Sequence, residues 1–460
     1  MVQVASKTSS LRKYLPQLIA GFGVTMVLVQ LGLSSGWSSP YLAKLTAPGS
    51  SLLLTDEEAS WVASLLNLGR FLGAFVGALS VSYFGSKRTM LFTLVPISLC
   101  WVLTIVATRT EFLYLARFSS GVGLGMTYSS FPLYLGEVSL PEIRGALVSL
   151  AACGGTFGVM IGNIAGSYLN MEVSATIYLV PCIALMVLFL WMPESPHHFV
   201  KEDKLEEAKK SIQWYRANHQ IEEELDAVKR FVSNAVSETF SDKLQELRKP
   251  ALMKAMILIV VLWAFMQLSG FNSILFYMEL IIIQSKSTLI EPKIVVMYVS
   301  ASAVVASVFS IVMIDKCGRR ILLIGSSLGV TLGMLGLGIH FYCIDRGLNV
   351  SQLQWLPIAS IFLFDVAFFA GLMCVPSAVL SELFPTNVKC IAACFASLAG
   401  AIFAFISTKT YQPLIEIIGQ SNVFFVYAGL TILIVPYALI CMPETKGKTL
   451  QQIQDDLVKR

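Results

Sequence analysis

Charged residues are scarce in this sequence. Asp, Glu, Lys and Arg make up 13% of the 460 residues, and 55% of the residues are hydrophobic. A soluble domain carries about 25% charged residues, so the composition excludes an ordinary soluble protein. The formal net charge of +4 is too small to suggest a nucleic-acid partner. We therefore expect the chain to have a lipid bilayer around it and no nucleic acid as a partner.

Residues for enzyme or metal chemistry are also few. The four histidines have no metal-ligand spacing, and no nucleophile–base set is present. The nine cysteines form no CxxC pair and mostly lie in apolar stretches, where Cys acts as a small hydrophobe. The GKT segment at 447–449 resembles the end of a phosphate loop, but Met442 stands where that loop needs Gly. We expect no enzyme activity, no metal and no cofactor.

Apolar runs of about 20 residues, the length of a bilayer-spanning helix, recur along the chain. Twelve such runs predict an all-α, multi-pass membrane protein. The first six lie near 15–36, 59–80, 89–107, 113–136, 146–168 and 175–192. The second six lie near 252–284, 292–314, 321–343, 353–380, 391–412 and 421–442.

Basic residues mark one side of the membrane. Segments that would share a side carry Lys87, Arg88, Arg144, Arg319 and further Lys and Arg residues, and the opposite segments carry far fewer. Basic residues accumulate on the cytoplasmic side, so we expect both termini there. The sequon at Asn349 then lies outside and is a candidate for glycosylation.

The only long polar stretch, about 193–251, separates the two sets of runs. Its segments KLEEAKKSIQWY and IEEELDAVKRFV place apolar residues at helical spacing among charges, a pattern typical of short amphipathic helices. A solvated linker explains most of this pattern. A lid that braces the cytoplasmic side is the alternative.

The two halves of the chain repeat each other. FPLYLGEVSLPEIRG has Glu137 and Arg144 seven residues apart, and VPSAVLSELFPTNVKC has Glu382 and Lys389 at the same spacing. YFGSKRTML matches KCGRRILLI, and MPESP matches MPETK, in the same order. A parallel repeat of this kind predicts two six-helix bundles with a site between them. The expected domains are 1–192, the linker 193–251, 252–442 and a cytoplasmic tail, 443–460.

The repeated motifs also place an acid–base set at the cytoplasmic ends of both bundles. Charged residues there should pair across the bundles when the opposite side is open, and release when the bundles rock. Anchoring of cytoplasmic turns is the simpler reading, but it does not explain the matched spacing. The predicted gating residues are Arg88, Glu137, Arg144, Glu194, Arg319, Arg320, Glu382, Lys389 and Glu444.

These motifs resemble the sugar porters of the major facilitator superfamily, and among them the insect facilitated trehalose transporters. The resemblance covers nearly the whole chain. It rests on ARFSSGVGLGMTYSSFPLYLGEVSLPEIRG, PESP, QLSGFN, DKCGRR, TKTYQ and PETKGKTL. The chain departs from the family at Ser82 and Ser86, which replace an acid and an Arg, and at Lys389 and Cys390.

The resemblance implies a sugar site between the bundles. Gln267 and Asn272 keep the polar residues of span seven, and we expect the helix to break near Ser269-Gly270 beside them. At the other contact positions the residue is small or apolar where the family has Gln, Asn or Trp. The expected substrate-binding set is Gln267, Asn272, Met266, Ala152, Ala303, Ser377, Phe369 and Ala401.

The expected function is facilitated sugar transport, of trehalose or a hexose, by alternating access in the plasma membrane. Proton-coupled relatives carry an acid in span one, where this chain has Ser34, so we expect a uniporter with a monomeric functional unit. A carrier of a different small polar solute and a non-transporting sensor on the same scaffold are the alternatives. Arg70 and Asp365 lie inside apolar spans and should each need a partner; a mutual pair is possible, whereas Lys409 can snorkel.

Overall fold

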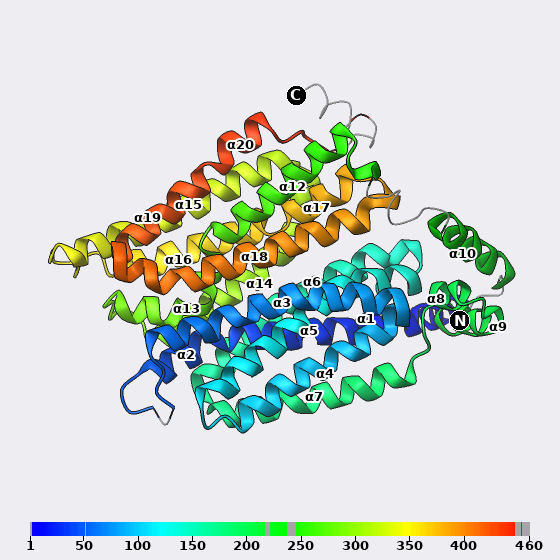
Figure 1. Cartoon of the computed structure of the whole chain (residues 1–460), viewed down its shortest axis with the longest axis horizontal. Helices are drawn as coiled ribbons and strands as arrows, with labels where there is room; N and C mark the ends of the chain where they lie inside the picture. The colour runs from blue at the N-terminus through cyan, green and yellow to red at the C-terminus, as the bar shows by residue number, and fades with distance from the viewer. Residues whose placement is uncertain (1, 51, 217–220, 237–244, 447–451, 453–460) are drawn as a thin grey trace.

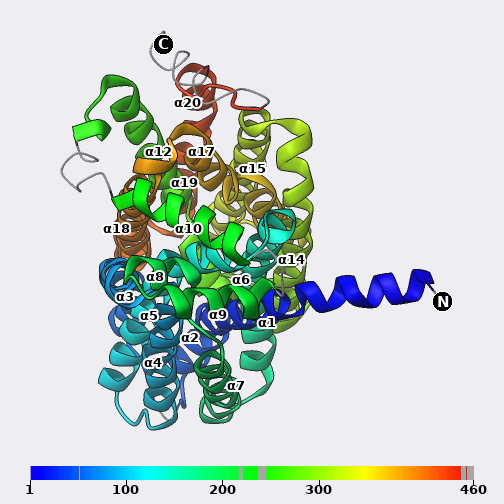
Figure 2. The same ribbon diagram turned by 90° about the vertical axis from the view of Figure 1, so that its right-hand side faces the viewer.

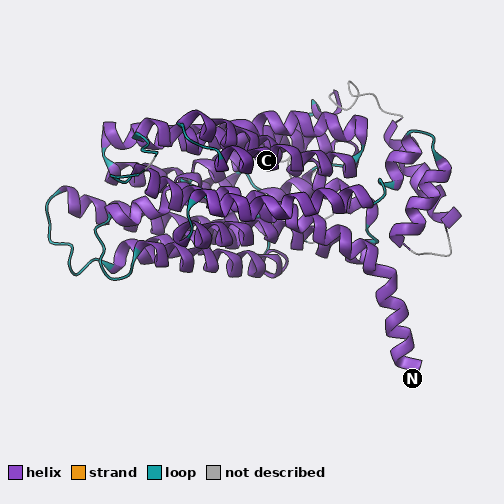
Figure 3. Ribbon diagram, turned by 90° about the horizontal axis from the view of Figure 1, so that it is seen from below, coloured by secondary structure: helices purple, strands orange, loops and turns teal. Residues whose placement is uncertain are grey.

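The computed structural model describes residues 2–50, 52–216, 221–236, 245–446 and 452. Every regular element in these residues is a helix, and none is a strand (Figure 3). Long helices lie along one common axis and form two bundles, one from each half of the chain (Figure 1). A helix satisfies its own backbone hydrogen bonds, which is what an apolar surrounding requires.

The first bundle holds the helices before the polar linker. Thr55 and Glu58 form a capping box that starts α3, and Pro141 stands in the first turn of α6, a favourable place for proline. The helices are α1 (Val2–Gly36), α2 (Ser38–Thr46), α3 (Asp56–Phe84), α4 (Ser86–Ile105), α5 (Thr110–Val138), α6 (Pro141–Tyr168) and α7 (Met171–Trp191).

Linker helices α8 (Pro196–Lys201), α9 (Leu205–Arg216) and α10 (Ile221–Val236) follow among the described residues. The amphipathic pattern predicted α9 and α10 but not α8. These helices lie together at one end of the bundles (Figure 2). We call this end the linker end, and the opposite end, where α2 lies, the far end.

The second bundle contains several interrupted helices. The first and last spans are split, and the span at 355–383 contains a π-helical turn, η1. The elements are α12 (Pro250–Leu268), α13 (Phe271–Gln284), α14 (Pro292–Cys317), α15 (Arg319–Asp345), α16 (Trp355–Ala367), η1 (Phe368–Leu372), α17 (Val375–Leu383), α18 (Thr386–Ile418), α19 (Gln420–Ile432) and α20 (Ile434–Ile440).

The predicted break in span seven is confirmed. α12 ends at Leu268 and α13 begins at Phe271, and Gly270 between them has φ +84°. Glycine adopts this left-handed backbone without the steric penalty of a Cβ. The Ser269 hydroxyl donates to the Met266 carbonyl at 2.8 Å and so satisfies one of the carbonyls that the break frees.

Within the described residues, eleven spans are long and apolar enough to cross a membrane, and α5 supplies the twelfth. α5 is as long as α3, but its middle is rich in glycine and serine, which lowers its hydropathy. The glycines let it approach α3 closely: a Cβ at Gly121 would lie 2.1 Å from the Leu66 carbonyl oxygen. Small residues allow such backbone contact between membrane helices. The molecule is a multi-pass, all-α membrane protein with twelve spans.

Candidate functional site

Polar contacts between the two bundles lie between their far ends and their middle. α3 packs against α18, α6 against α14, and α2 against α13. At the linker end, the Arg319–Glu382 ion pair lies within the second bundle, and the Arg216 bond to the Glu137 carbonyl joins the linker to the first bundle. The hydrogen bonds that join the two bundles therefore lie at the far end and in the middle. The Ser39 hydroxyl accepts from the Glu279 N–H, and the Ser60 and Tyr277 hydroxyls donate to the carbonyls of Lys409 and Ala59. The side-chain pairs are Asn67 with Thr408, Thr156 with Ser307 and Asn163 with Ser300.

The exposure of side chains along α5 also differs between the half of the helix near the far end and the half near the linker end. Arg117 and Gly121 are buried in its far half, whereas Tyr128 and Pro132, on a similar side of the helix, are exposed in its linker half. Tyr128 is 40% exposed, and Arg70 lies over its ring and over that of Trp263 in the second bundle. The surface between the bundles is therefore accessible from the linker end.

Gln267 and Asn272 lie on either side of the helix break and bind each other. The Asn272 amide nitrogen donates to the Gln267 side-chain oxygen at 2.7 Å. Their exposed fractions are 4% and 5%. The two polar groups kept in span seven thus form one buried pair that satisfies part of its own hydrogen-bonding capacity.

The other predicted contact positions divide into two groups. Ala152 and Ser377 are exposed, and Ala152 lies one turn from Thr156, which contacts the second bundle. The rest are buried in this conformation, so the structure does not bring the whole predicted set onto one accessible surface. The buried positions are Met266, Ala303, Phe369 and Ala401.

Aromatic residues fill part of the space that small residues leave. A Cβ at Gly400 would lie 2.6 Å from Trp263 Cε3, so the Trp263 ring covers the place where a larger side chain would be. Phe271 stacks on Phe368, with ring centroids 4.0 Å apart. Sequence reasoning missed Trp263 and Tyr128. Their spacing from known motifs places Trp263 on α12 and Tyr128 on α5. It does not show which way their rings point.

Arg70 lies between these aromatic rings. Its guanidinium carbon is 5.4 Å from the centre of the Tyr128 ring and 6.0 Å from that of Trp263. Within the described residues, Arg70 Nε and Asp365 Oδ2 are buried without hydrogen-bond partners, so the possible Arg70–Asp365 pair does not form here. The Lys409 ammonium nitrogen lies 4.1 Å from the centre of the Trp61 ring, near the far end.

A second buried arginine holds the far half of the first bundle. Arg117 donates to the Ser34 carbonyl oxygen at 2.5 Å and to the Ser38 hydroxyl at 2.8 Å. Its guanidinium also lies 4.0 Å from the centre of the Trp37 ring. All of these partners are neutral, so no carboxylate that could carry a proton contacts Arg117 among the described residues.

At the linker end, the two bundles share one capping arrangement. Glu194 accepts hydrogen bonds from the backbone N–H groups of Lys87 and Arg88, each at 2.9 Å, and so caps α4. Glu444 accepts from the N–H groups of Arg319 and Arg320 at 3.2 and 3.1 Å and caps α15. A carboxylate at a helix N-terminus is favoured by the helix dipole and by the free N–H groups.

The neighbouring acids differ between the bundles. Glu382 forms an ion pair with Arg319 at 2.8 Å, whereas Glu137 accepts a hydrogen bond from the Ser86 hydroxyl at 2.5 Å. Arg144 is exposed and donates to the Ser139 carbonyl at 3.3 Å. The contacts of Glu137, Arg144 and Glu382 described here therefore lie within each bundle in this conformation. Pairing across the bundles stays a prediction for the opposite conformation.

The linker helix α9 is bound to the first bundle. The Tyr215 hydroxyl bonds with the Tyr134 hydroxyl at 2.9 Å and donates to the Pro193 carbonyl at 2.7 Å. Gln17 of α1 donates to the Tyr215 carbonyl and accepts from the Leu140 N–H. These contacts connect α1, α5 and the end of α7 through one helix.

Beside α9, burial shifts the protonation of one histidine. Burial and the nearby Arg216 and Arg144 lower the pKa of His197 to about 4. His197 is therefore neutral at physiological pH.

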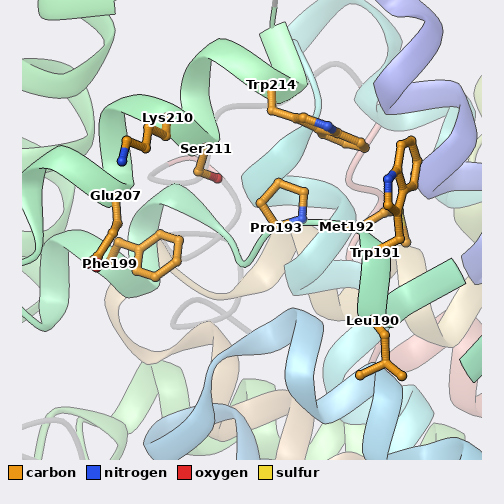
Figure 4. Close-up of a pocket in the computed structure, with 9 residues that line it drawn as sticks. All are labelled: Leu190, Trp191, Met192, Pro193, Phe199, Glu207, Lys210, Ser211 and Trp214. Atoms are coloured by element: carbon orange, nitrogen blue, oxygen red, sulfur yellow. The ribbon is translucent and has the colours of Figure 1, made fainter. Parts of the chain in front are cut away.

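A pocket of about 460 Å³ lies between the end of α7 and helices α8 and α9. Figure 4 shows Trp191 and Trp214 on one side, with Phe199 and Lys210 on the other. The two indole rings meet edge to face with centroids 5.4 Å apart. Aromatic residues with a polar edge are typical of the membrane–water interface, and this pocket lies on the first bundle, away from the surface between the bundles.

Asn349 lies in the loop between α15 and α16 at the far end and is exposed. Its side-chain oxygen accepts hydrogen bonds from the N–H and the hydroxyl of Ser351 at 2.9 and 2.6 Å. The sequon therefore forms a local turn on the surface.

Comparisons with known proteins agree on one family. The family model described as "Sugar (and other) transporter" matches residues 17–457. The facilitated trehalose transporter Tret1 of Polypedilum vanderplanki is 32% identical over 96% of this chain and 88% of its own length. The protein of the same name from Anopheles gambiae is 30% identical over 96% of this chain and 56% of its own length. This chain spans about half the length of several such relatives.

Solved structures show the same fold. The inward-open xylose transporter XylE from E. coli matches with a TM-score of 0.77 and 18% identity, over 95% of this chain and 98% of that one. The proton:xylose symporter XylE bound to 6-bromo-6-deoxy-D-glucose matches with a TM-score of 0.74 and 20% identity, over 97% of this chain and 99% of that one. The architecture is the twelve-helix fold of the major facilitator superfamily.

Proposed function

This chain belongs to the sugar transporter family, whose members are membrane transporters and not enzymes, and from this premise we propose that it carries trehalose or a hexose by facilitated diffusion. The two domains, 1–192 and 252–442, rock against each other and expose the site to one side at a time. Helix α9 of the linker 193–251 braces the first domain, and the expected tail, 443–460, lies mostly outside the described residues. A single chain is the functional unit.

The position of the hydrogen bonds between the bundles carries the proposal. They lie from the far end to the middle, whereas Tyr128, in the linker half of α5, is 40% exposed. A carrier needs a second state with the reverse arrangement. In that state Glu137, Arg144, Glu382 and Lys389 approach one another and hold the linker end closed.

The sugar would bind beside the break in span seven. Gln267 and Asn272 provide amide groups there, and the predicted contact residues Ala152 and Ser377 are exposed on α6 and α17. Met266, Ala303, Phe369 and Ala401 complete the site when the bundles close around the solute.

The neutral environment of Arg117 supports a uniporter. Ser34 occupies the position in span one where proton-coupled relatives carry an acid, and its contacts with Arg117 involve only its carbonyl and hydroxyl groups. A hydroxyl group does not titrate near pH 7. Solute movement would then follow the solute gradient alone.

The basic residues at the linker end support a cytoplasmic location for that end and for both termini. We place the protein in the plasma membrane, with Asn349 outside and glycosylated. Loss of a mass shift in Asn349→Gln, compared with the wild type after glycosidase treatment, tests this orientation.

Uptake in proteoliposomes tests the transport proposal directly. Vesicles with the purified protein should equilibrate labelled trehalose or glucose, and unlabelled sugar inside should accelerate entry of the label. An uncoupler should leave this exchange unchanged. Empty vesicles and vesicles with denatured protein are the controls, and equal uptake in all three would contradict the proposal.

A further inference from the structure

Arg70 lies in the middle of a membrane-spanning helix and faces the interior of the protein. α3 runs from Asp56 to Phe84, so Arg70 lies at the middle of this helix, far from either end. The lipid-facing stripe of α3 includes Leu68, Leu72 and Leu79, all exposed. At 100° per residue, Arg70 points away from that stripe.

The charge of Arg70 has no acidic counterpart among the residues that the structure describes. Among the described residues, Arg70 makes no ion pair, and its buried Nε has no acceptor. A guanidinium offers five N–H donors and keeps its proton under all ordinary conditions. Charged residues inside membrane spans almost always have a partner or face water, and they mark ligand pathways.

The surroundings of Arg70 place it between the bundles. Tyr128 belongs to α5 of the first bundle and Trp263 to α12 of the second, and Arg70 contacts the faces of both rings. The rings provide cation–π attraction but no set of acceptors for the donors of the guanidinium. Arg70 itself is half-buried and Tyr128 is exposed, so a solute that enters from the linker end can reach the guanidinium.

The polar groups for a neutral sugar are reduced at the same site. Gln267 and Asn272 are hydrogen-bonded to each other, and Met266 and Ala401 offer no hydrogen-bonding side chain. The fixed positive charge is thus the strongest polar feature that this surface presents to a solute.

We propose that Arg70 binds a carboxylate of the transported solute, so that the preferred solute is a hydroxylated organic acid such as a sugar acid. This inference rests on the proposed transport function and changes its substrate class. The planar guanidinium matches a carboxylate with two parallel hydrogen bonds. Tyr128 and Trp263 provide the apolar faces against which the carbon ring of the solute lies.

Two solutes that differ only in charge test the proposal on the wild-type protein. Glucuronate and its methyl ester share their hydroxyl groups, but only the acid carries a charge. In proteoliposomes, glucuronate should compete with its own labelled form about 10- to 100-fold better than the ester does, the range expected for a hydrogen-bonded charge. Equal competition by the two compounds overturns the proposal.

Substitutions then assign the preference to Arg70. Arg70→Gln should abolish the acid-over-ester ratio, and Arg70→Lys should keep part of it because the charge remains. Arg109→Gln is the matched control, since Arg109 is an exposed arginine before α5 at the far end, and it should keep the wild-type ratio. An unchanged ratio in Arg70→Gln overturns the proposal, and the wild-type comparison decides if that variant does not fold.

Labelled glucose and trehalose in the same vesicles separate this proposal from the transport function. Uptake of a neutral sugar without uptake of glucuronate overturns the role of Arg70 and leaves sugar transport standing. Uptake of glucuronate alone supports the role of Arg70 and excludes neutral sugars as the solute. Uptake of neither compound contradicts both proposals.

Discussion

Ser86 donates a hydrogen bond to Glu137 at 2.5 Å, in the place where the second bundle has the ion pair between Arg319 and Glu382. The two positions correspond because each follows a glycine with positive φ, Gly85 at +92° and Gly318 at +87°. One bundle therefore uses a neutral donor where the other uses a charge. The linker ends of the two bundles have the same arrangement, but the interaction with the neighbouring acid is stronger in the second bundle.

This difference predicts the effect of Arg319→Ser, which gives the second bundle the residue of the first. The ion pair is partly buried, so its loss should reduce stability by about 1–2 kcal/mol, between the values for exposed and buried pairs. Thermal unfolding in detergent measures the change. Ser86→Ala is the matched variant and should lower stability by no more than about 1 kcal/mol. A larger loss for Ser86→Ala would contradict the ranking.

Coupling should appear if an acid replaces Ser34. Wild-type vesicles should reach equal sugar concentrations on both sides under a pH gradient. In Ser34→Asp the carboxylate would lie beside Arg117 and could carry a proton, so accumulation should approach about tenfold per pH unit for one proton per solute. Ser34→Asn is the uncharged control. Accumulation by the wild type that an uncoupler abolishes would refute facilitated diffusion.

Gln267 and Asn272 should behave as one unit in solute binding. Gln267→Ala or Asn272→Ala alone should weaken affinity by about 1–3 kcal/mol, a factor of roughly 5 to 150. The double variant should lose little more, because each single change already breaks their mutual bond. Competition binding on the four proteins measures this cycle. Strictly additive losses would show that the residues act independently.

The attachment of α9 to the first bundle should depend on the Tyr215 hydroxyl. Tyr215→Phe removes its bonds to Tyr134 and to the Pro193 carbonyl and should reduce stability by about 1–3 kcal/mol. Tyr134→Phe leaves the Pro193 bond in place and should reduce stability less. Protease sensitivity of the linker and thermal unfolding provide the two measurements. Equal values for the two variants would contradict a separate role for the Pro193 bond.

Stability should also fall in mild acid because of His197. Its pKa is lowered to about 4 in the folded protein by burial and by Arg216 and Arg144, whereas an unfolded histidine has a pKa near 6.5. The unfolded state therefore binds the proton first, and stability decreases as pH falls from about 6.5 to 4, by up to about 3 kcal/mol. His197→Gln should flatten the melting temperature in this range. An equally steep profile in His197→Gln would exclude this histidine as the cause.

The sequence predicted features that depend on local chemistry. The break at Gly270 follows from the weakness of glycine within a helix, and the repeat indicated that Glu194 and Glu444 take equivalent places, although it did not show that each caps a helix start. The twelve spans follow from the length of apolar runs. These features need no knowledge of how distant helices meet.

Contacts between distant helices could not be predicted in the same way. The sequence showed that Arg70 is a charge in an apolar span, but the rings around it come from α5 and α12. Likewise, the spacing of Gln267 and Asn272 indicated a shared side of the helix, but their mutual hydrogen bond depends on the geometry of the break. Side-chain direction at a break and packing between bundles are tertiary properties.

Gly270, the residue with the left-handed backbone at the break, limits which substitutions the protein can tolerate. A Cβ at Gly270 would lie 2.6 Å from the end of Met334 and 2.7 Å from the Tyr427 ring, in addition to the unfavourable φ of +84°. Met334 is flexible and can move aside, but the ring is rigid and bonded to Ser273 through its hydroxyl at 3.0 Å. Substitution at position 270 thus calls for a compensating change at Tyr427 in α19, so a lone substitution there is unfavourable.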